Sequence, residues 1–461
     1  MPYVSTRGQA APQSFADVLL AGLAPDGGLY APEVWPVVPA DEIAGFAGKS
    51  YPEVAAAILK RFAGDAFSDA ELKADIDAAY ATFDTPEVAP LAAIGPDTWL
   101  LELFHGPTLA FKDIAMQVLG RMFSRALGQR GGRATVVVAT SGDTGSAAIA
   151  ALGDLANIDV VVLYPHNRVS EVQRRQMTVT PFANVSTIAV EGTFDDTQNL
   201  LKQFFADKAF AQRIGLTAVN SINFARVAAQ AVYYFTATAK LGRPARFVVP
   251  TGNFGDVFAG EVAQRMGLAT EKLIVATNSN DILARALNGG VYESGKAHPT
   301  LSPSMDIQVA SNFERALFEA SGRDTDWVRA AMAEFGQTAR LSLPPAVLAA
   351  LRERYAAVHT GDDATLDTIA KIHRETGRLI DPHTAVAVAA AAQVSAGAGP
   401  TVILSTADPA KFPDAVRRAT GKTPPLPPRL AHLYDGVERV TVLPNDKARI
   451  RDFILTRSAH S

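Results

Sequence analysis

The chain has 461 residues, of which 48% are hydrophobic and 20% charged, with a formal net charge of −4. This length suits a globular protein of two or three domains, and the charge lacks the basic excess of a nucleic-acid-binding protein. The chain contains no cysteine, which excludes disulfides, thiolate metal sites and a cysteine nucleophile.

The N-terminal residues and the apolar runs of the chain predict its cellular location. Residues 1–8 lack the basic and apolar blocks of a signal peptide, and no uncharged apolar run is long enough to cross a bilayer. We therefore expect a cytoplasmic protein that acts on a small molecule, with no nucleic-acid or membrane partner.

The N-terminal part of the chain is expected to be helical. Residues 14–22 and 51–62 have the pattern of helices, and Pro- and Gly-rich turns separate them. We assign residues 1–95 to an N-terminal helical region.

Lys112 is the first candidate for chemistry along the chain. It follows Gly-Pro-Thr-Leu-Ala-Phe at residues 106–111, a segment that could enclose it. An amine attacks a carbonyl only when it is deprotonated, and a confined, partly desolvated setting favours that form. Lys112 is therefore a candidate Schiff-base lysine. A solvated lysine on a helix is the alternative, and His105 nearby is expected to be structural.

Short apolar runs alternate with longer amphipathic segments through the rest of the chain. Such runs are typical of strands buried on both faces in the parallel sheets of α/β proteins. The runs are residues 135–139, 159–164, 246–250, 273–276 and 401–404. We predict a smaller α/β domain over residues 96–225, carrying Lys112, and a larger one over residues 226–461.

The first of two glycine-punctuated loops covers residues 140–145, Thr-Ser-Gly-Asp-Thr-Gly, between a predicted strand and a predicted helix. Its backbone N–H groups and the hydroxyls of Ser141 and Thr144 suit a small carboxylate. Asp143 is either a cap or turn residue or a hydrogen-bonding partner of a cofactor oxygen.

The second loop, residues 252–256 (Gly-Asn-Phe-Gly-Asp), also stands between a strand and a helix, where backbone N–H groups can bind a phosphate. An ordinary turn is the alternative. The dinucleotide spacing Gly-x-Gly-x-x-Gly and the P-loop are both absent, so NAD and ATP enzymes are disfavoured. Arg226 opens another predicted helix and is either a ligand of a second phosphate or a solvated side chain. The eight histidines show no metal-ligand spacing, so we expect no metal.

Taken together, these segments resemble the threonine synthases, in the longer form found in many bacteria and fungi, a family of fold type II pyridoxal-phosphate enzymes. The resemblance runs through most of the chain, in one order. The matching segments are residues 3–8, 22–30, 101–113, 139–148, 169–177, 220–223, 250–256, 303–308 and 405–412.

The resemblance implies a tryptophan synthase β-like fold and roles for individual residues. Lys112 would hold pyridoxal 5′-phosphate as a Schiff base and act as the catalytic residue. The other cofactor-binding residues would be Asp143, Gly252, Asn253, Phe254, Gly255, Asp256 and, at the pyridine nitrogen, Thr406. The substrate-binding residues would be Thr140, Ser141, Gly142 and Thr144 at the carboxylate, and Asn220, Ser221 and Arg226 at the phosphate.

The implied reaction is the last step of threonine biosynthesis, conversion of O-phospho-L-homoserine and water to L-threonine and phosphate, by a monomer or homodimer. Two alternatives stay open: another fold type II lyase such as a threonine or serine dehydratase, and a non-catalytic homologue that binds a phosphorylated amino acid. The chain departs from the family pattern at Asp408, where histidine is usual, and at Asn167, where glycine is usual. Asp408 puts a histidine's role near the ring in doubt, whereas Asn167 is expected to alter only a turn.

Overall fold

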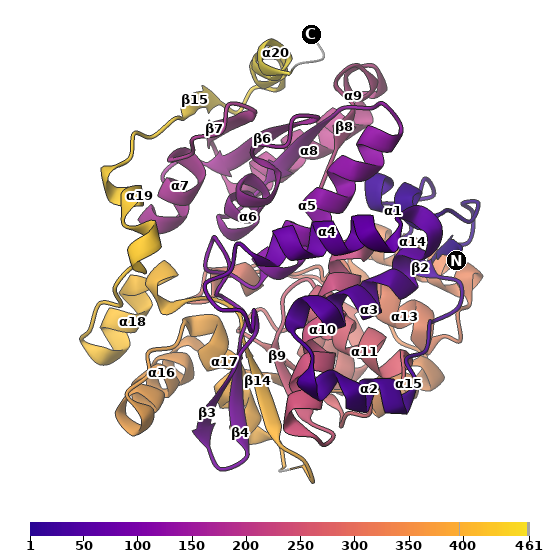
Figure 1. Ribbon diagram of the computed structural model, residues 1–461, viewed down its shortest axis with the longest axis vertical. Coiled ribbons are helices and arrows are strands. Elements are labelled where there is room, and N and C mark those ends of the chain that lie inside the picture. Colours follow the sequence, from indigo (N-terminus) through magenta and orange to yellow (C-terminus); the bar gives the residue numbers. More distant parts are fainter. Residues whose placement is uncertain (396, 459–461) are drawn as a thin grey trace.

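A computed structural model describes residues 1–395 and 397–458 and confirms the α/β fold with two parallel sheets (Figure 1). The six-stranded sheet has the order β13-β10-β9-β14-β4-β3, and only the β3–β4 pair is antiparallel. Its strands are β3 (Leu91–Gly95), β4 (Thr98–Glu102), β9 (Arg246–Pro250), β10 (Leu273–Thr277), β13 (Tyr355–His359) and β14 (Thr401–Ser405).

The five-stranded sheet is parallel throughout and has the order β15-β7-β6-β5-β8. Its strands are β5 (Ala134–Ala139), β6 (Ile158–Pro165), β7 (Val185–Glu191), β8 (Leu216–Thr217) and β15 (Thr441–Pro444). Two small antiparallel pairs complete the strands: β1 (Tyr3–Ser5) with β2 (Tyr30–Pro32), and β11 (Val291–Glu293) with β12 (Arg340–Ser342).

Helices cover both faces of each sheet. They are α1 (Phe15–Ala21), α2 (Ala40–Gly45), α3 (Tyr51–Ala63), α4 (Asp69–Tyr80), α5 (Lys112–Gln129), α6 (Asp143–Leu152), α7 (Glu171–Thr178), α8 (Phe194–Ala206), α9 (Lys208–Ile214), α10 (Phe224–Leu241), α11 (Gly255–Arg265), α12 (Ile282–Gly289), α13 (Phe313–Ala320), α14 (Thr325–Thr338), α15 (Pro345–Arg354), α16 (Asp362–Thr376), α17 (Pro382–Gln393), α18 (Pro413–Thr420), α19 (His432–Asp435) and α20 (Lys447–Arg457).

Side chains that alternate along each strand divide the core between the two faces. In β9, Phe247 and Val249 pack in the cluster that includes α10 and α11, whereas Val248 packs with α17. In β5, Val136 packs towards α6 and Val137 packs towards α8 and α20. All five predicted strand runs are confirmed, because doubly buried strands need apolar residues at every position.

The N-terminal helices begin where the sequence supplies caps. Ser14, Ser50 and Ser68 each form a capping box with an acidic residue three positions later, which starts α1, α3 and α4. The predicted helices at residues 14–22 and 51–62 are therefore confirmed as α1 and α3. Helices α3 and α4 pack on α10 and α5.

Sheet membership does not follow the predicted domain ranges. Strands β3 and β4, from the boundary around residue 95, pair into the six-stranded sheet beside β14, and β15 returns from the C-terminal part to pair with β7. Figure 1 shows this return as the yellow segment that ends in α20. The division at residues 95 and 225 into separate domains stays a prediction.

The strand directions place the site. The carboxyl ends of β4, β9 and β14 in one sheet and of β5 and β8 in the other lead into the five segments that carry the candidate residues. Ligands of open α/β sheets bind in the crevice outside such ends. No helix within residues 1–395 or 397–458 combines the length and apolar character needed to span a bilayer.

Candidate active site

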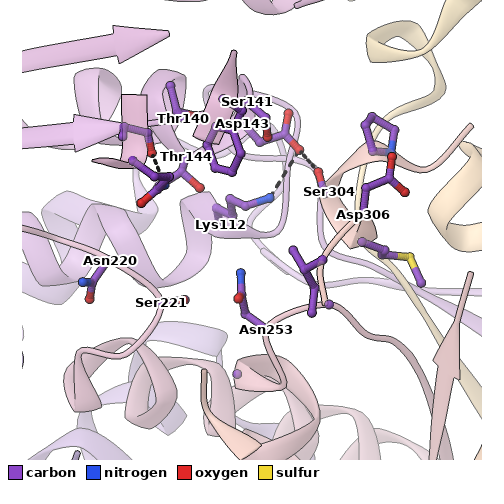
Figure 2. Close-up of a pocket in the computed structure, with 18 of the residues that line it drawn as sticks. Lys112, Thr140, Ser141, Asp143, Thr144, Asn220, Ser221, Asn253, Ser304 and Asp306 are labelled. Carbon is purple, nitrogen blue, oxygen red and sulfur yellow. Dashed lines mark hydrogen bonds and ion pairs between the residues drawn. The ribbon is translucent and has the colours of Figure 1, made fainter. Parts of the chain in front are cut away.

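A cavity of about 560 Å³ brings the predicted site residues together. It is lined by Lys112, Thr140, Ser141, Asp143, Thr144, Asn220, Ser221, Arg226, Gly252, Asn253, Phe254, Gly255, Asp256 and Thr406. Gly142 is the one predicted site residue outside this lining. Figure 2 shows Lys112 directed towards Asp143, with Asn253 and Ser304 contributed by other parts of the chain.

Lys112 is held inside the protein by the segment that precedes it. Phe111 N donates to Thr406 O at 2.9 Å, and Asp408 N donates to Leu109 O at 3.0 Å, which fixes the approach to α5 against the end of β14. Leu109 adopts a left-handed φ of 63°. The Lys112 side chain is only 12% exposed, so the reading as a solvated surface lysine is wrong.

The amine of Lys112 lies in surroundings that oppose its positive charge. Burial lowers the pKa of Lys112, the nearby Asp143 carboxylate counteracts this effect, and Lys411 and Arg226 reinforce it. Lys112 Nζ lies 3.3 Å from Asp143 Oδ2 and 4.9 Å from the centre of the Phe111 ring. A lowered pKa favours the deprotonated amine, the form that attacks carbonyls.

Asp143 receives donors on both carboxylate oxygens. Oδ1 accepts from Gln173 Nε2 at 2.9 Å and lies 3.0 Å from Lys411 Nζ. Oδ2 faces Lys112 and accepts from Ser304 Oγ at 3.1 Å. Burial alone would raise the pKa of Asp143, but the charges of Lys411 and Lys112 hold it well below its usual range. Asp143 is the first residue of α6 and Gly142 is its N-cap, so the reading of Asp143 as a cap is wrong.

The other residues of the first loop either shape the loop or present hydroxyl groups on the cavity. Thr140 Oγ1 accepts from Gly142 N at 2.9 Å and from Gly145 N at 3.0 Å, so this hydroxyl shapes the loop. Gly142 has a φ of 138°, and a Cβ there would lie 2.5 Å from Gln173 Cδ. Ser141 is exposed and Thr144 half-buried, both on the cavity.

The second loop presents backbone rather than side chains. Phe254 takes a left-handed φ of 65° immediately before α11, while its ring packs against Phe313 and Tyr355 in the core. A Cβ on Gly252 would lie 2.9 Å from Ser304 O. The backbone N–H groups at the positive end of α11 therefore face the cavity in the geometry that suits a phosphate.

Asp256, in the first turn of α11, holds an unusual carboxyl group. One oxygen accepts a hydrogen bond from the Tyr233 hydroxyl, and the other, Oδ2, is buried without a hydrogen-bond partner in the described chain. Burial raises the pKa of Asp256 to about 7. The neutral acid is favoured on folding, so this group costs stability as the pH rises from about 4 to about 7.

Asp256→Asn is therefore expected to stabilise the protein at high pH. The amide oxygen can still accept from Tyr233, but no charge is buried, which at pH 8 avoids a penalty of up to about 4 kcal/mol. The melting temperature of the variant should exceed that of the parent at pH 8, and the gap should narrow towards pH 5. The exposed Asp367→Asn is the control. A gap that does not change with pH contradicts the neutral-acid interpretation.

Arg226 lies in the first turn of α10, behind the Asn223 cap. The side chain is buried, forms no ion pair with a described acidic residue, and its Nε has no hydrogen-bond partner. Burial lowers the pKa of Arg226 to about 10, so it still carries a positive charge at neutral pH. The reading as a solvated arginine is wrong. A buried cation without a counterion costs stability, and an anion that occupied the cavity would offset this cost.

Asn312 and Arg315 couple the two loops that surround Arg226. Asn312 Nδ2 donates to Ser221 O at 3.0 Å and to Asn253 O at 3.2 Å. Arg315 donates to Ile222 O at 2.6 Å. Sequence reasoning missed both residues, since nothing in their local pattern points to either loop.

His383 was also missed by sequence reasoning. Its Nδ1 lies 2.8 Å from Asp381 Oδ1, and its Nε2 accepts from Ser304 N at 3.2 Å, which places the ring hydrogen on Nδ1. The ring lines the cavity and holds the 303–305 segment against the site. His105 instead pairs with Glu102 at 2.9 Å and is outside the cavity lining, as expected for a structural histidine.

The two departures from the family pattern have local explanations. Asp408 accepts from Ala410 N at 2.8 Å and so caps the short 3₁₀ helix η4 (Pro409–Lys411), outside the cavity lining. Asn167 has a left-handed φ of 59°, the conformation in which asparagine is the best substitute for glycine.

The residues fit pyridoxal phosphate. The cavity offers a buried amine at Lys112, a backbone cradle at residues 252–256, and an unpaired guanidinium at Arg226 for a second anion. Within the described ranges, no group of three or more His, Asp or Glu side chains is arranged to hold a metal ion.

Three family models match successive parts of the chain. A model described as "Threonine synthase N terminus" matches residues 2–80, one described as "Pyridoxal-phosphate dependent enzyme" matches residues 84–357, and one described as "Threonine synthase, C-terminal" matches residues 384–454.

Individual proteins match along the full length. A threonine synthase from Pseudomonas aeruginosa is 49% identical over 459 residues, covering 98% of each chain. The crystal structure of PLP-bound threonine synthase from Brucella melitensis has a TM-score of 0.98 at 50% identity and covers 100% of both chains. The yeast threonine synthase structure has a TM-score of 0.94 at 36% identity, covering 100% of this chain and 99% of that one.

Proposed function

Because this chain belongs to the threonine synthase family of pyridoxal-phosphate enzymes, we propose that it converts O-phospho-L-homoserine and water to L-threonine and phosphate. The observation that carries the proposal is the buried, unpaired Arg226 on the same cavity as Lys112. The substrate carries a phosphate in addition to that of the cofactor, so the reaction requires two anion sites. The 252–256 loop and Arg226 are suited to be those two sites.

Each group of residues has a proposed role in holding the cofactor and the substrate. Lys112 would attach the cofactor, residues 252–256 would hold its phosphate, and Asp143 and Thr406 would contact its ring. Residues 140–144 would bind the substrate carboxylate, and Asn220, Ser221 and Arg226 its phosphate. When bound, pyridoxal phosphate supplies an electron sink that stabilises negative charge next to the substrate's amino group.

Lys112 would move the protons of the reaction. Its neutral amine, released when the substrate's amino group takes its place, can accept the proton from Cα. A proton is then lost from Cβ, phosphate leaves Cγ with the electrons of the C–O bond, and Cγ is protonated to become the methyl group. Water adds its hydroxyl group at Cβ and gives up its other proton, and a proton returns to Cα to complete threonine. Arg226 would hold the phosphate, before and after the bond breaks, away from solvent.

The proposal is tested by the absorption spectrum of the purified protein and by its products. We expect the visible band of a lysine-bound cofactor, followed by equal amounts of threonine and phosphate when O-phosphohomoserine is added. Formation of 2-oxobutyrate from threonine or serine, without any need for a phosphorylated substrate, would favour a dehydratase instead. A colourless protein that still binds phosphate would favour the non-catalytic homologue.

Asn312→Ala should weaken substrate binding without changing any group that contacts it. The variant loses two hydrogen bonds that hold the 220–223 and 252–256 loops, each worth roughly 1 kcal/mol. KM for the phosphorylated substrate should rise roughly tenfold or more. Asn288→Ala is the matched control, because its side-chain amide donates to Ala357 O at 3.2 Å, outside the cavity lining. Equal KM values for the two variants contradict the coupling.

Two finer statements also belong to the proposal. We expect the enzyme to work in the cytoplasm, as a monomer or homodimer. Sedimentation of the purified protein gives the oligomeric state.

A further inference from the structure

Lys411 is a buried lysine directly behind the candidate site. It ends the 3₁₀ helix η4 that Asp408 caps, and its side chain is 0% exposed. Nζ donates to Thr108 O at 2.7 Å and to Gln176 Oε1 at 3.1 Å, and it lies 3.0 Å from Asp143 Oδ1. An ammonium group has three hydrogens, and each has an acceptor here.

Two lysines therefore share one carboxylate. Lys411 faces Asp143 Oδ1, and Lys112 faces Asp143 Oδ2 at 3.3 Å. Lys411 has the shorter distance and the full set of acceptors, whereas Lys112 opens onto the cavity. Lys411 thus offsets part of the Asp143 charge that favours the ammonium form of Lys112.

We infer that Lys411 is a positioning residue that neutralises Asp143 and so leaves the amine of Lys112 free to react. The inference rests on the proposed function only in that Lys112 is the lysine that must attack the cofactor's aldehyde. It assigns Lys411 no contact with the substrate. It also assigns a role to Asp408, because this residue caps the helix η4 that contains Lys411.

Apart from Asp143 and Lys411, the charged and titratable groups on the cavity are common to every variant below. They are Arg168 after β6, Asp195 on α8, Arg226 on α10, Asp256 on α11, His298 after β11, Asp306 after η3 (Pro303–Met305) and His383 on α17. Burial lowers the pKa of Lys112, with Lys411 and Arg226 adding to the effect.

The test measures how fast the full-length protein, stripped of cofactor, captures added pyridoxal 5′-phosphate at different pH values. The visible band gives the rate, and borohydride reduction with peptide mapping confirms attachment at Lys112. In Lys411→Met, Lys112 is the only lysine that faces Asp143, so the carboxylate favours the ammonium form of Lys112 more strongly. The midpoint of the rate profile should therefore move up by about one pH unit, and capture at pH values below the midpoint should slow about tenfold. Lys411→Arg keeps the charge and should keep the parent's midpoint. Ionisations of the free cofactor are common to all variants.

Removing both charges separates electrostatics from packing. In the double variant Asp143→Asn/Lys411→Met the midpoint should return towards that of the parent, whereas a packing defect would persist. If Lys411→Met does not fold, the comparison of Asp143→Asn with the double variant remains, and the double variant should have the higher midpoint. A midpoint in Lys411→Met equal to that of the parent, or an unrestored double variant, overturns the inference. Failure of the parent to capture cofactor at any pH overturns the proposed function instead.

Discussion

Replacing Lys112 with alanine is expected to abolish turnover, by at least about a thousandfold. The variant loses both the amine that attaches the cofactor and the base that takes the substrate's proton, and no other described lysine lies on the cavity. The readouts are phosphate release from O-phosphohomoserine and borohydride-stable labelling of the protein. Both should disappear while the melting temperature stays close to that of the parent, because within the described residues the hydrogen bond and ion pair of the Lys112 side chain are with Asp143 alone.

A small amine in solution provides the sharpest control on this result. Alanine at position 112 leaves space where the lysine side chain stood, so added methylamine should restore part of the turnover, with a pH dependence set by the free amine. Lys202→Ala, on the exposed face of α8, should retain full activity. Turnover of Lys112→Ala within tenfold of the parent would show that another group performs the chemistry.

The sequence was sufficient for the parts of the site that are local. Residues 140–145 and 252–256 each follow a buried strand and precede a helix, and the chemistry of a strand-to-helix turn can be read within a dozen residues. Arg226 and Lys112 were found in the same way, each at the start of a helix. What local pattern left open was burial, which decides whether a lysine or arginine is solvated or reactive.

The residues that sequence reasoning missed act across long separations. Lys411 and His383 reach the site from η4 and α17, and their partners Asp143 and Ser304 belong to distant segments. Lys411 lies in a segment that carries the family resemblance, and His383 lies in the first turn of an ordinary helix. Neither residue has a spacing that predicts its contacts. Only the pairing of β14 with β4 and β9 brings these segments together.

Strand pairing was likewise beyond local reasoning at the sheet edges. β15 and β13 are edge strands with half-exposed residues, so they lack the continuous apolar run that identified the central strands. β4 is short and is followed directly by the Lys112 segment, which obscures its end. β4 and β15 are among the strands that carry the chain across the predicted domain ranges, whereas β13 stays within residues 226–461.

Arg226→Met is expected to lower kcat/KM for O-phosphohomoserine by about a hundredfold or more, mainly through KM. A guanidinium can donate two charge-assisted hydrogen bonds to a phosphate, each worth about 1.5 to 3 kcal/mol, and methionine supplies none. Arg226→Lys should have a kcat/KM between those of the parent and Arg226→Met, because an ammonium group keeps the charge but not the planar pair of donors. An unchanged KM in Arg226→Met would place the substrate phosphate elsewhere.

Arg226→Met, which lowers kcat/KM, should not lower the stability of the protein. This difference distinguishes an anion site from a structural arginine. With no anion present, the parent buries an unpaired cation, so Arg226→Met should melt no lower than the parent, and by the argument for buried charges it should melt higher. Added phosphate should raise the melting temperature of the parent with cofactor bound, and should leave that of the variant unchanged. A structural arginine would give the reverse pattern, with a less stable variant and no selective protection by phosphate. The cost in stability is then the physical reason why Arg226 is ready for a ligand.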